Sequence, residues 1–292
     1  MNPTARLLID SQCALGEGPI WHEGRQQLFF FDINEQSLFA ATAAGEIVDS
    51  WLFNETVAAA AVIDDHTLAL ATDTGLKTFD LATGGMNRVN EIEADNEATR
   101  TNDSRVHPSG AFWIGTMTRS KSETPIGSVY HYRAGALTTL KSGIRIPNAT
   151  CFSPDGRIAY WSDTPTRQIL QVATDPATGL PAGEWKLFAD LSDGPGYPDG
   201  AVVDSEGYLW NARWGGSCVV RHAPDGSVDR VIELPVSQVT CLAFGGPELK
   251  TLFITSANTG LSAEQLAAEK IAGGVFVIDL DIAGLPETPI AL

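Results

Sequence analysis

Apolar and polar positions alternate along this chain in a unit that occurs six times. Each unit has an apolar segment, a turn rich in Gly, Asp, Pro or Ser, and a second apolar segment that ends in small polar residues. Two apolar segments joined by such a turn predict a β-hairpin. The six units are GPIWHEGRQQLFFFDI, AAVIDDHTLALATD, SRVHPSGAFWIGTM, TCFSPDGRIAYWSD, AVVDSEGYLWNARW and LAFGGPELKTLFITSA.

One apolar position in each unit serves as an anchor that defines the period of the repeat. Consecutive anchors lie 41, 44, 46, 51 and 41 residues apart. Repeats of roughly 40–50 residues are typical of propeller blades. The anchors are Trp21, Val62, Val106, Phe152, Val203 and Phe244.

Two further strands follow each hairpin, except in the last unit. Third strands such as QSLFAAT and fourth strands such as EIVDSWLF alternate moderately between apolar and polar residues. The sixth unit has no fourth strand, because the chain ends at DIAGLPETPIAL, and the N-terminal ARLLIDS belongs to no unit. We therefore predict an all-β protein in which residues 1–292 form a single domain. It is a six-bladed β-propeller of four-stranded blades, and the N-terminal strand closes the ring.

A helical pattern occurs once, at residues 261–272, in LSAEQLAAEKIA. Ser262 is a suitable N-cap, and Gln265 has the spacing of a capping box. Gly273 is a suitable helix end. We expect this helix to be an addition to the sixth blade.

Composition limits the partners of the chain. The net charge is −17, which argues against nucleic acid and against anionic membrane surfaces, because both attract basic proteins. The N-terminal MNPTARLLIDSQ lacks the features of a signal peptide, and no apolar stretch is long enough to span a bilayer. We expect a cytoplasmic protein with no nucleic-acid or membrane partner. The four cysteines are widely spaced, so we expect them to be reduced and packed in the core.

Equivalent positions on the innermost strands of a propeller lie around one central axis. The residues four places before the anchors should therefore meet at one mouth of the channel. Four of the six carry a carboxylate or an amide carbonyl, and either group binds cations. The six residues are Glu17, Ala58, Asn102, Asn148, Asp199 and Thr240.

Two carboxylates and two amides form a cluster of hard oxygen ligands. Such a set favours Ca²⁺, with Mg²⁺, Mn²⁺, Fe²⁺ and Zn²⁺ as alternatives. Asn and Asp also cap turns and strand ends, so each residue taken alone has a purely structural explanation. The shared register favours a metal site, because two carboxylates facing one axis repel each other and lose hydration.

Arg100 lies two residues before Asn102, so both side chains should share one face of a strand. Arg100 is therefore a candidate to bind a hydroxyl, carbonyl or carboxylate group of a substrate. The alternative is a surface arginine paired with a neighbour such as Glu97. Other catalytic motifs, GxSxG, HExxH, GxGxxG and the P-loop among them, do not occur, and the five histidines have no metal-ligand spacing.

Several motifs together resemble the regucalcin/gluconolactonase family, also called the senescence marker protein family. They are LGEGPIW, RTND, GTM, IPNATCFSPDG, YPDGAVVDSEGYLW and AGGVFVIDLD, and they cover essentially the whole chain. The resemblance implies a six-bladed propeller with one divalent cation in its channel. It also implies a bacterial sugar lactonase.

The resemblance also implies roles for individual residues. Glu17, Asn148 and Asp199 would bind the metal, and Asp199 would also act as the catalytic acid and base. Arg100 would bind substrate, and Asn102 would bind either substrate or metal. The chain departs from the family after GTM: TRSKSET places Arg119, Ser120 and Lys121 first and Glu123 later, where some relatives carry acidic residues. This departure favours a substrate with an additional carboxylate.

These observations lead to a hypothesis and two alternatives. The hypothesis is metal-dependent hydrolysis of a sugar lactone, an aldono- or aldarolactone, to the sugar acid in a carbohydrate oxidation pathway. One alternative keeps the site and changes the ester, as in calcium-dependent phosphotriesterases and arylesterases. The other is a non-catalytic binding module in which the cation only stabilises the propeller. The oligomeric state is left open by the sequence.

Overall fold

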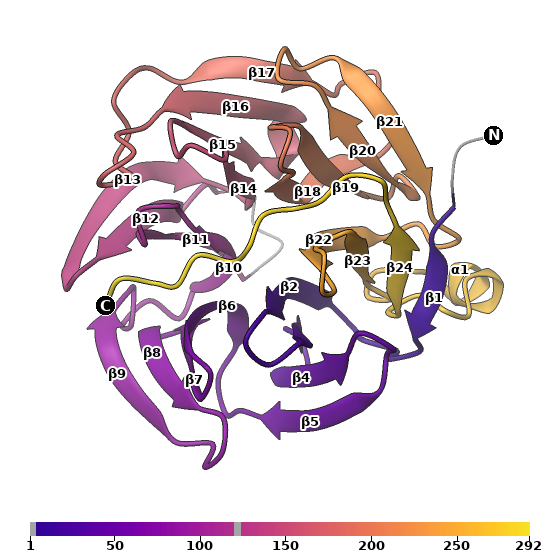
Figure 1. Ribbon diagram of the computed structural model, residues 1–292, viewed down its shortest axis with the longest axis horizontal. Helices are drawn as coiled ribbons and strands as arrows, with labels where there is room; N and C mark the ends of the chain where they lie inside the picture. Colours follow the sequence, from indigo (N-terminus) through magenta and orange to yellow (C-terminus); the bar gives the residue numbers. More distant parts are fainter. Residues whose placement is uncertain (1–3, 120–123) are drawn as a thin grey trace.

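The computed structural model describes residues 4–119 and 124–292. Figure 1 shows six antiparallel sheets of four strands arranged in a ring around a central axis. The predicted six-bladed, all-β architecture is therefore confirmed. In five blades the strands follow chain order from the channel outward.

The blades are numbered along the chain, and their strands have the following bounds. Blade 1 contains β2 (Gly16–His22), β3 (Gln27–Asp32), β4 (Ser37–Thr42) and β5 (Ile47–Leu52). Blade 2 contains β6 (Val57–Asp64), β7 (Thr67–Thr72), β8 (Gly75–Asp80) and β9 (Met86–Glu91). Blade 3 contains β10 (Thr99–Val106), β11 (Phe112–Thr118), β12 (Gly127–Arg133) and β13 (Ala136–Ile144).

The second half of the ring has the same plan. Blade 4 contains β14 (Pro147–Phe152), β15 (Ile158–Asp163), β16 (Gln168–Ala173) and β17 (Lys186–Asp190), with a 3₁₀ turn, η1 (Thr164–Thr166), after β15. Blade 5 contains β18 (Tyr197–Val203), β19 (Leu209–Trp214), β20 (Cys218–His222) and β21 (Val228–Glu233). Blade 6 contains β22 (Val239–Gly245), β23 (Thr251–Ser256), β24 (Val275–Asp279) and, from the other end of the chain, β1 (Arg6–Ile9).

The N-terminal strand closes the ring as predicted. Strand β1 pairs antiparallel with β24, with Arg6 opposite Val277. It is the outermost strand of blade 6, in the place where the sixth unit lacks a strand of its own. Blade 6 is therefore complete only because the N-terminal strand β1 pairs there with β24, a strand from the C-terminal part of the chain.

Each blade is packed on both faces, which explains the continuous apolar runs of the second strands. In β3, Phe29 and Phe31 pack in a cluster with blade 2, whereas Leu28 and Phe30 pack in a cluster with blade 6. All four side chains are buried. The outermost strand β5 reads IVDSWL and is largely exposed. Alternate residues of one strand therefore bind adjacent blades together.

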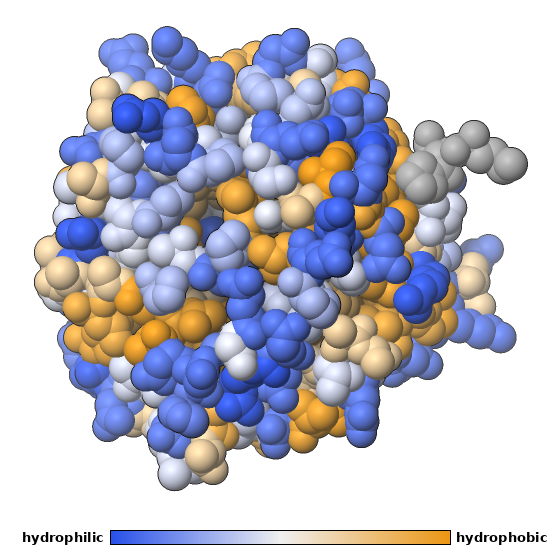
Figure 2. All heavy atoms as spheres, in the orientation of Figure 1, coloured by the Kyte–Doolittle hydropathy of each residue, from blue (hydrophilic) through white to orange (hydrophobic). Residues whose placement is uncertain are grey.

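The C-terminal segment, residues 280–292, crosses the middle of the ring on one face (Figure 1). On blades 5 and 6 its backbone bonds join Ser205 N to Ala283 O and Gly284 N to Leu249 O. On the other side, Ile290 N donates to Val62 O in blade 2. Figure 2 shows this face, where polar side chains surround smaller apolar areas.

The helical segment is shorter than predicted. Helix α1 spans Ala263–Ala268, and the capping box of Ser262 and Gln265 is present. The helix does not continue to Gly273, so the predicted end was wrong. Residues 270–273 form turns instead, which lets Ala272 pack in the core between blades 5 and 6. None of the described helices is long and apolar enough to cross a membrane. All four cysteines are buried and free, as expected.

A buried ion-pair cluster stabilises blade 5. Arg221 is nearly inaccessible and donates to Asp204, Glu206 and Asp229 at 2.7–2.8 Å. The carboxylate of Asp204 is fully buried and also accepts from Trp210 Nε1 at 2.8 Å. Among the described residues, Arg221 is the one cation that pairs with the buried charge of Asp204. The fold of this blade therefore depends on Arg221.

Replacing Arg221 tests this dependence. Arg221→Met leaves the Asp204 charge buried without its ion pair, so we expect a loss of about 3–5 kcal/mol in the free energy of unfolding. Arg230→Met removes the exposed pair with Asp281 and should cost less than about 1 kcal/mol. Equilibrium denaturant unfolding measures both values. Equal losses for the two variants would show that the buried pair has no special weight.

Candidate metal and substrate site

The five residues chosen from the sequence line one cavity. This cavity has a volume of about 260 Å³ and lies at the N-terminal ends of the innermost strands. Glu17 comes from β2, Arg100 and Asn102 from β10, Asn148 from β14, and Asp199 from β18. The ring thus brings together side chains that lie up to 182 positions apart in the sequence.

A bulge in each innermost strand sets the direction of these side chains. In blade 4, Asn148 pairs with Ser162 and Cys151 with Tyr160, so two residues of β14 lie opposite one residue of β15. All six innermost strands have a register shift near this position. Bulges re-aim side chains and are common beside active sites. Gly18 and Ala149, which follow Glu17 and Asn148, have positive φ values of 53° and 56°.

Asp199 is held in its bulge by a side chain from the next strand. Asn211 of β19 is fully buried, and its Nδ2 donates to Asp199 O at 2.8 Å and to Gly200 O at 3.2 Å. These bonds satisfy carbonyls that the irregular strand leaves out of the sheet ladder. The sequence analysis did not identify Asn211. A polar residue within the otherwise apolar LWNARW was the available signal.

The amide side chains are oriented by one another and by Thr164. Asn102 Nδ2 donates to Asn148 Oδ1 at 3.1 Å and to Pro147 O at 2.9 Å. Asn148 Nδ2 donates to Thr164 Oγ1 at 2.8 Å, and that hydroxyl donates to Pro198 O at 2.8 Å. This chain of bonds joins blades 3, 4 and 5 in the wall of the cavity. The hydrogen bonds therefore fix the orientation of both amide groups in the cavity wall.

The two carboxylates are electrostatically unfavourable in the absence of a cation. Burial, together with the negative charge of Asp103, raises the pKa of Glu17 to about 8, against the opposing effect of the Gly18 N–H and Arg100. The pKa of Asp199 is also raised, first by burial and then by the charges of Glu17 and Asp103. Each carboxylate thus disfavours ionisation of the other.

Asp103 is a third acidic group near the site, and the sequence analysis missed it. Regular alternation would turn it away from Asn102, but the bulge between Thr101 and Ser104 breaks that alternation. Its Oδ2 accepts from Thr150 N at 2.7 Å, which links β10 to the strand that carries Asn148. The adjacent acid in TRTNDSR was the signal that could have found it.

Arg100 lines the cavity and supports Asn102. Its Nη1 donates to Thr101 O at 2.8 Å and to Asn102 Oδ1 at 2.9 Å. Burial lowers its pKa to about 10, which leaves the guanidinium charged at neutral pH. Within the described residues no ion pair joins it to Glu97, which is the alternative that the spacing left open.

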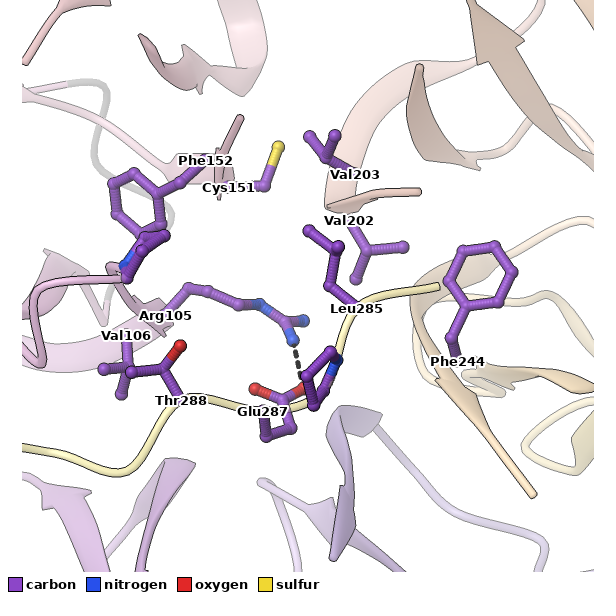
Figure 3. A pocket seen from close by; sticks show the side chains of 12 residues that line it. Arg105, Val106, Cys151, Phe152, Val202, Val203, Phe244, Leu285, Glu287 and Thr288 are labelled. Carbon is purple, nitrogen blue, oxygen red and sulfur yellow. Dashed lines mark hydrogen bonds and ion pairs between the residues drawn. The ribbon is translucent and has the colours of Figure 1, made fainter. Parts of the chain in front are cut away.

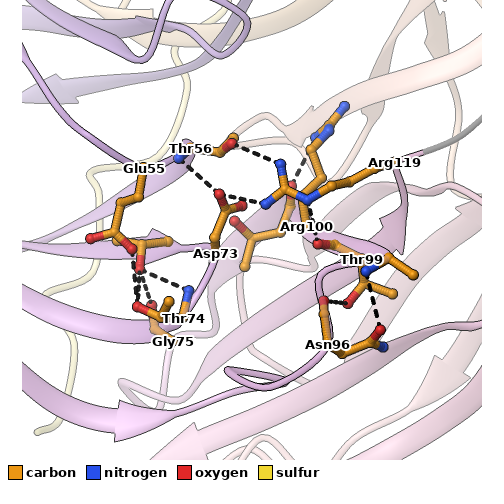
Figure 4. A network of polar contacts seen from close by, with 12 residues as sticks. Glu55, Thr56, Asp73, Thr74, Gly75, Asn96, Thr99, Arg100 and Arg119 are labelled. Atoms are coloured by element: carbon orange, nitrogen blue, oxygen red, sulfur yellow. Dashed lines mark hydrogen bonds and ion pairs between the residues drawn. The ribbon is translucent and has the colours of Figure 1, made fainter.

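A second arginine lies at the rim of this mouth and does not line the cavity. Figure 4 shows Arg119 between blades 2 and 3, where its Nη2 binds Asp73 Oδ2 at 2.5 Å. Its Nε donates to Thr99 O at 2.8 Å, and its Nη1 donates to Thr56 Oγ1 at 3.3 Å. Ser120, Lys121 and Glu123 lie outside the described residues. The predicted preference for an additional substrate carboxylate therefore stays a prediction.

The donor set fits a hard divalent cation. Two buried acidic groups repel each other, and the amide side chains of Asn102 and Asn148 line the same cavity. The described residues contain no group of three or more His, Cys, Asp or Glu side chains able to hold a metal, so a cation here needs the amides. The hydroxyl of Thr240 is not available as a metal ligand, because it is hydrogen-bonded to Gly16 O and to Thr255 Oγ1.

Aromatic residues contribute little to the walls. Trp214 lines the cavity, together with the apolar Leu15 and Met117. Tyr197 is 42% exposed and lies under the guanidinium of Arg167, 4.6 Å from its carbon, so it contributes nothing to the lining. The cavity is therefore mixed in character, with its charged groups at the channel end.

The other end of the channel is covered by the C-terminal segment. Val106, Phe152 and Phe244, at the C-terminal ends of their strands, line a small cavity of about 70 Å³ there. Figure 3 shows Arg105 reaching toward Glu287 of the C-terminal segment, and Arg105 Nη1 lies 2.8 Å from Glu287 Oε1. A small molecule therefore reaches the carboxylates from the first mouth.

The raised pKa of Glu17 predicts a pH dependence for the metal-free protein. Between the ordinary pKa of 4.5 and about 8, the folded state keeps a proton that the unfolded state releases. The free energy of unfolding should therefore fall as pH rises through this window, by about 1 kcal/mol or more. Glu17→Gln should remove this component, whereas the exposed Glu184→Gln should retain it. Thermal unfolding between pH 5 and 8 with a chelator measures the difference. Parallel profiles for all three proteins would contradict the electrostatic account.

Comparisons with known proteins agree with this geometry. Residues 15–258 match the family described as SMP-30/Gluconolactonase/LRE-like region. The chain is 38% identical to the L-arabinolactonase of Azospirillum brasilense, over 96% of this chain and 93% of that protein. It is 32% identical to the pentonolactonase XacC of Haloferax volcanii, over 97% of each chain.

A solved structure is similar over the whole molecule. It is a calcium-binding protein, regucalcin, from Agrobacterium tumefaciens, with a TM-score of 0.96 and 38% identity, covering 100% of this chain and 98% of that one. Family match, sequence identity and fold all agree with the resemblance found in the motifs. This chain belongs to the SMP-30/gluconolactonase family.

Proposed function

We propose that this protein hydrolyses the ester bond of a sugar lactone to give the open sugar acid, with a divalent cation held by Glu17, Asn148 and Asp199. The observation that carries the proposal is one cavity in which two carboxylates, two amides and an arginine meet. Relatives at 32–38% identity over nearly the whole chain are named lactonases of pentose sugars. Their names support the sugar lactone as the substrate class.

The cavity suits a small polar ring. A volume of about 260 Å³ accommodates a small molecule rather than a polymer. Arg100, Asn34 and Thr259 supply hydrogen-bonding groups for hydroxyls, and Trp214 supplies an apolar surface for ring carbons. Arg100 or Asn102 would fix the substrate, and a bidentate guanidinium is well suited to this role. The particular sugar is not determined by this lining.

The chain's own residues account for the proton transfers. A bound divalent cation supplies a Lewis acid that polarises the lactone carbonyl. Asp199 accepts a proton from the water that adds to the carbonyl carbon, and then returns it to the ring oxygen as the ester C–O bond breaks. The carboxylate has two oxygen atoms, so one can act as ligand and the other as base. The Asn211 bonds keep the backbone of Asp199 fixed during these steps.

The cation proposed is Ca²⁺. The oxygen-only donor set is that of a hard ion, and the similar protein from Agrobacterium tumefaciens is named as calcium-binding. The same set also suits Mn²⁺ and Mg²⁺, and carboxylates also bind Zn²⁺. The proposal includes a role in carbohydrate oxidation, where lactones form, and a cytoplasmic location.

Asp199→Asn tests the acid–base role. We expect kcat for lactone hydrolysis to fall by about 10²–10⁴, because the amide cannot accept the proton. Asp193→Asn, an exposed change in the preceding loop, should leave kcat unaltered. Titration calorimetry with Ca²⁺ establishes that the variant still binds metal. Near-normal hydrolysis by a metal-bound Asp199→Asn protein would remove Asp199 from this role.

Chelation followed by return of single metals tests the cofactor and the substrate class. Aldono- and aldarolactones should be hydrolysed in a pH-stat assay only after Ca²⁺ or another divalent ion is restored. Faster turnover of aryl esters or phosphotriesters would favour the alternative esterase. A chelator that lowers Tm in a protein without lactone turnover would favour the non-catalytic module.

A further inference from the structure

A second cavity of about 300 Å³ lies between blades 4 and 5, away from the channel. One wall is β17 with the loop at Gly194 and Pro195, and the other is the face of β19–β21 that carries Arg213 and His222. Most of the remaining lining is apolar, with Val220, Val228 and Val231 from blade 5. It is therefore an apolar cavity with one guanidinium in its wall.

Arg213 is almost completely buried and incompletely bonded. It is 2% exposed, and its Nε and Nη1 atoms have no hydrogen-bond partner among the described residues. Its Nη2 lies 2.8 Å from His222 Nε2. His222 Nδ1 lies 3.0 Å from Gly226 O, which can only accept, so Nδ1 carries the hydrogen and Nε2 accepts from Arg213. Nε and Nη1 carry three of the five guanidinium N–H groups, and none of these three has a partner among the described residues.

The charge of Arg213 has no counter-ion in the described part of the chain. Its neighbours are His222 and the buried thiol of Cys218. Burial lowers the pKa of His222 to about 4, so the imidazole is neutral, and burial raises the pKa of Cys218. The guanidinium of Arg167 is close enough to repel it, while donating to Gly194 O and Gly196 O at 3.0 and 2.7 Å. Asp190 at the cavity edge is exposed and accepts from Ser192.

This arrangement is costly unless an anion completes it. A buried charge without a partner loses hydration and gains nothing in return. Burial lowers the pKa of Arg213 to about 10, which still leaves it charged at neutral pH. Among the described residues neither Arg213 nor Arg167 forms an ion pair with a carboxylate, although the chain has a net charge of −17. The same chain fully pairs Arg221, which lies on the neighbouring strand.

We propose that the cavity between blades 4 and 5 binds a small carboxylate anion with a short apolar body. The unbonded N–H groups of Arg213 bind the carboxylate, and the valine side chains of blade 5 contact the apolar part. Guanidinium groups pair with carboxylates through parallel hydrogen bonds. This site is independent of the proposed lactone site, where Arg100 is the cation.

Butyrate is the probe that tests this site on the full chain. Calorimetric titration and thermal unfolding are performed with butyrate, with its neutral analogue butyramide, and with chloride at matched ionic strength. We expect butyrate to bind and to raise Tm, and butyramide to have no effect. Chloride should bind at least tenfold more weakly, because it lacks the apolar body.

Variants assign the binding to Arg213. Arg213→Met should reduce butyrate affinity at least tenfold, whereas Arg100→Met, which removes the cation of the lactone site, should leave it unchanged. Val228→Glu provides a second variant, and it should fold because Val228 is 61% exposed. The negative charge of the introduced carboxylate should also weaken butyrate binding.

Three results would overturn the proposal. They are the absence of butyrate binding to the wild-type protein, unchanged binding in Arg213→Met or Val228→Glu, and loss of binding in Arg100→Met alone. Chloride binding as tight as butyrate would overturn the assignment to a carboxylate. None of these outcomes depends on lactone turnover, so the failure of either proposal is distinguishable from the failure of the other.

Discussion

Packing of every blade on both of its faces is the constraint on which this structure depends. The second strands send alternate side chains into two different clusters, as Phe29 and Phe30 do in β3. Such blades are stable only between neighbours, so the ring must close, and β1 closes it by pairing with β24. Closure fixes the innermost strands around one axis. The position of Glu17 beside Asp199 follows from this closure rather than from any local preference.

Buried charge is treated in three different ways within this one molecule. Around Arg221 the chain supplies three carboxylates, so this buried positive charge is fully paired within the molecule. At the channel mouth the carboxylates of Glu17 and Asp199 outnumber the nearby guanidinium of Arg100, and the proposed divalent cation would offset this excess of negative charge. Between blades 4 and 5 the imbalance has the opposite sign, because Arg213 has no carboxylate partner in the described chain. The two incomplete sites are the places where the geometry indicates ligands.

Irregular backbone, not regular strand geometry, creates the candidate active site. Each innermost strand is bulged at the same level, so the pleat does not determine which side chains face the cavity. Asn211 is fully buried and the half-buried Thr164 lies in the cavity wall, and their side chains donate to the carbonyls of Asp199 and Pro198. Their cost in burial is offset by the hydrogen bonds that they make. The preorganisation of the site thus comes from residues that do not touch the cavity's central charges.

The sequence by itself determined the number of blades, the strands of each blade and the closing role of the N-terminal strand. It could do so because a repeated pattern of apolar positions reports burial locally, once per unit. The same register located Glu17, Arg100, Asn102, Asn148 and Asp199 in one cavity. Only the tertiary structure decided that α1 ends at Ala268, that Asp103 joins the acidic group, and that Arg213 lacks a counter-ion. Those features depend on bulges and on contacts between blades, and a one-dimensional pattern carries no record of which charges meet in space.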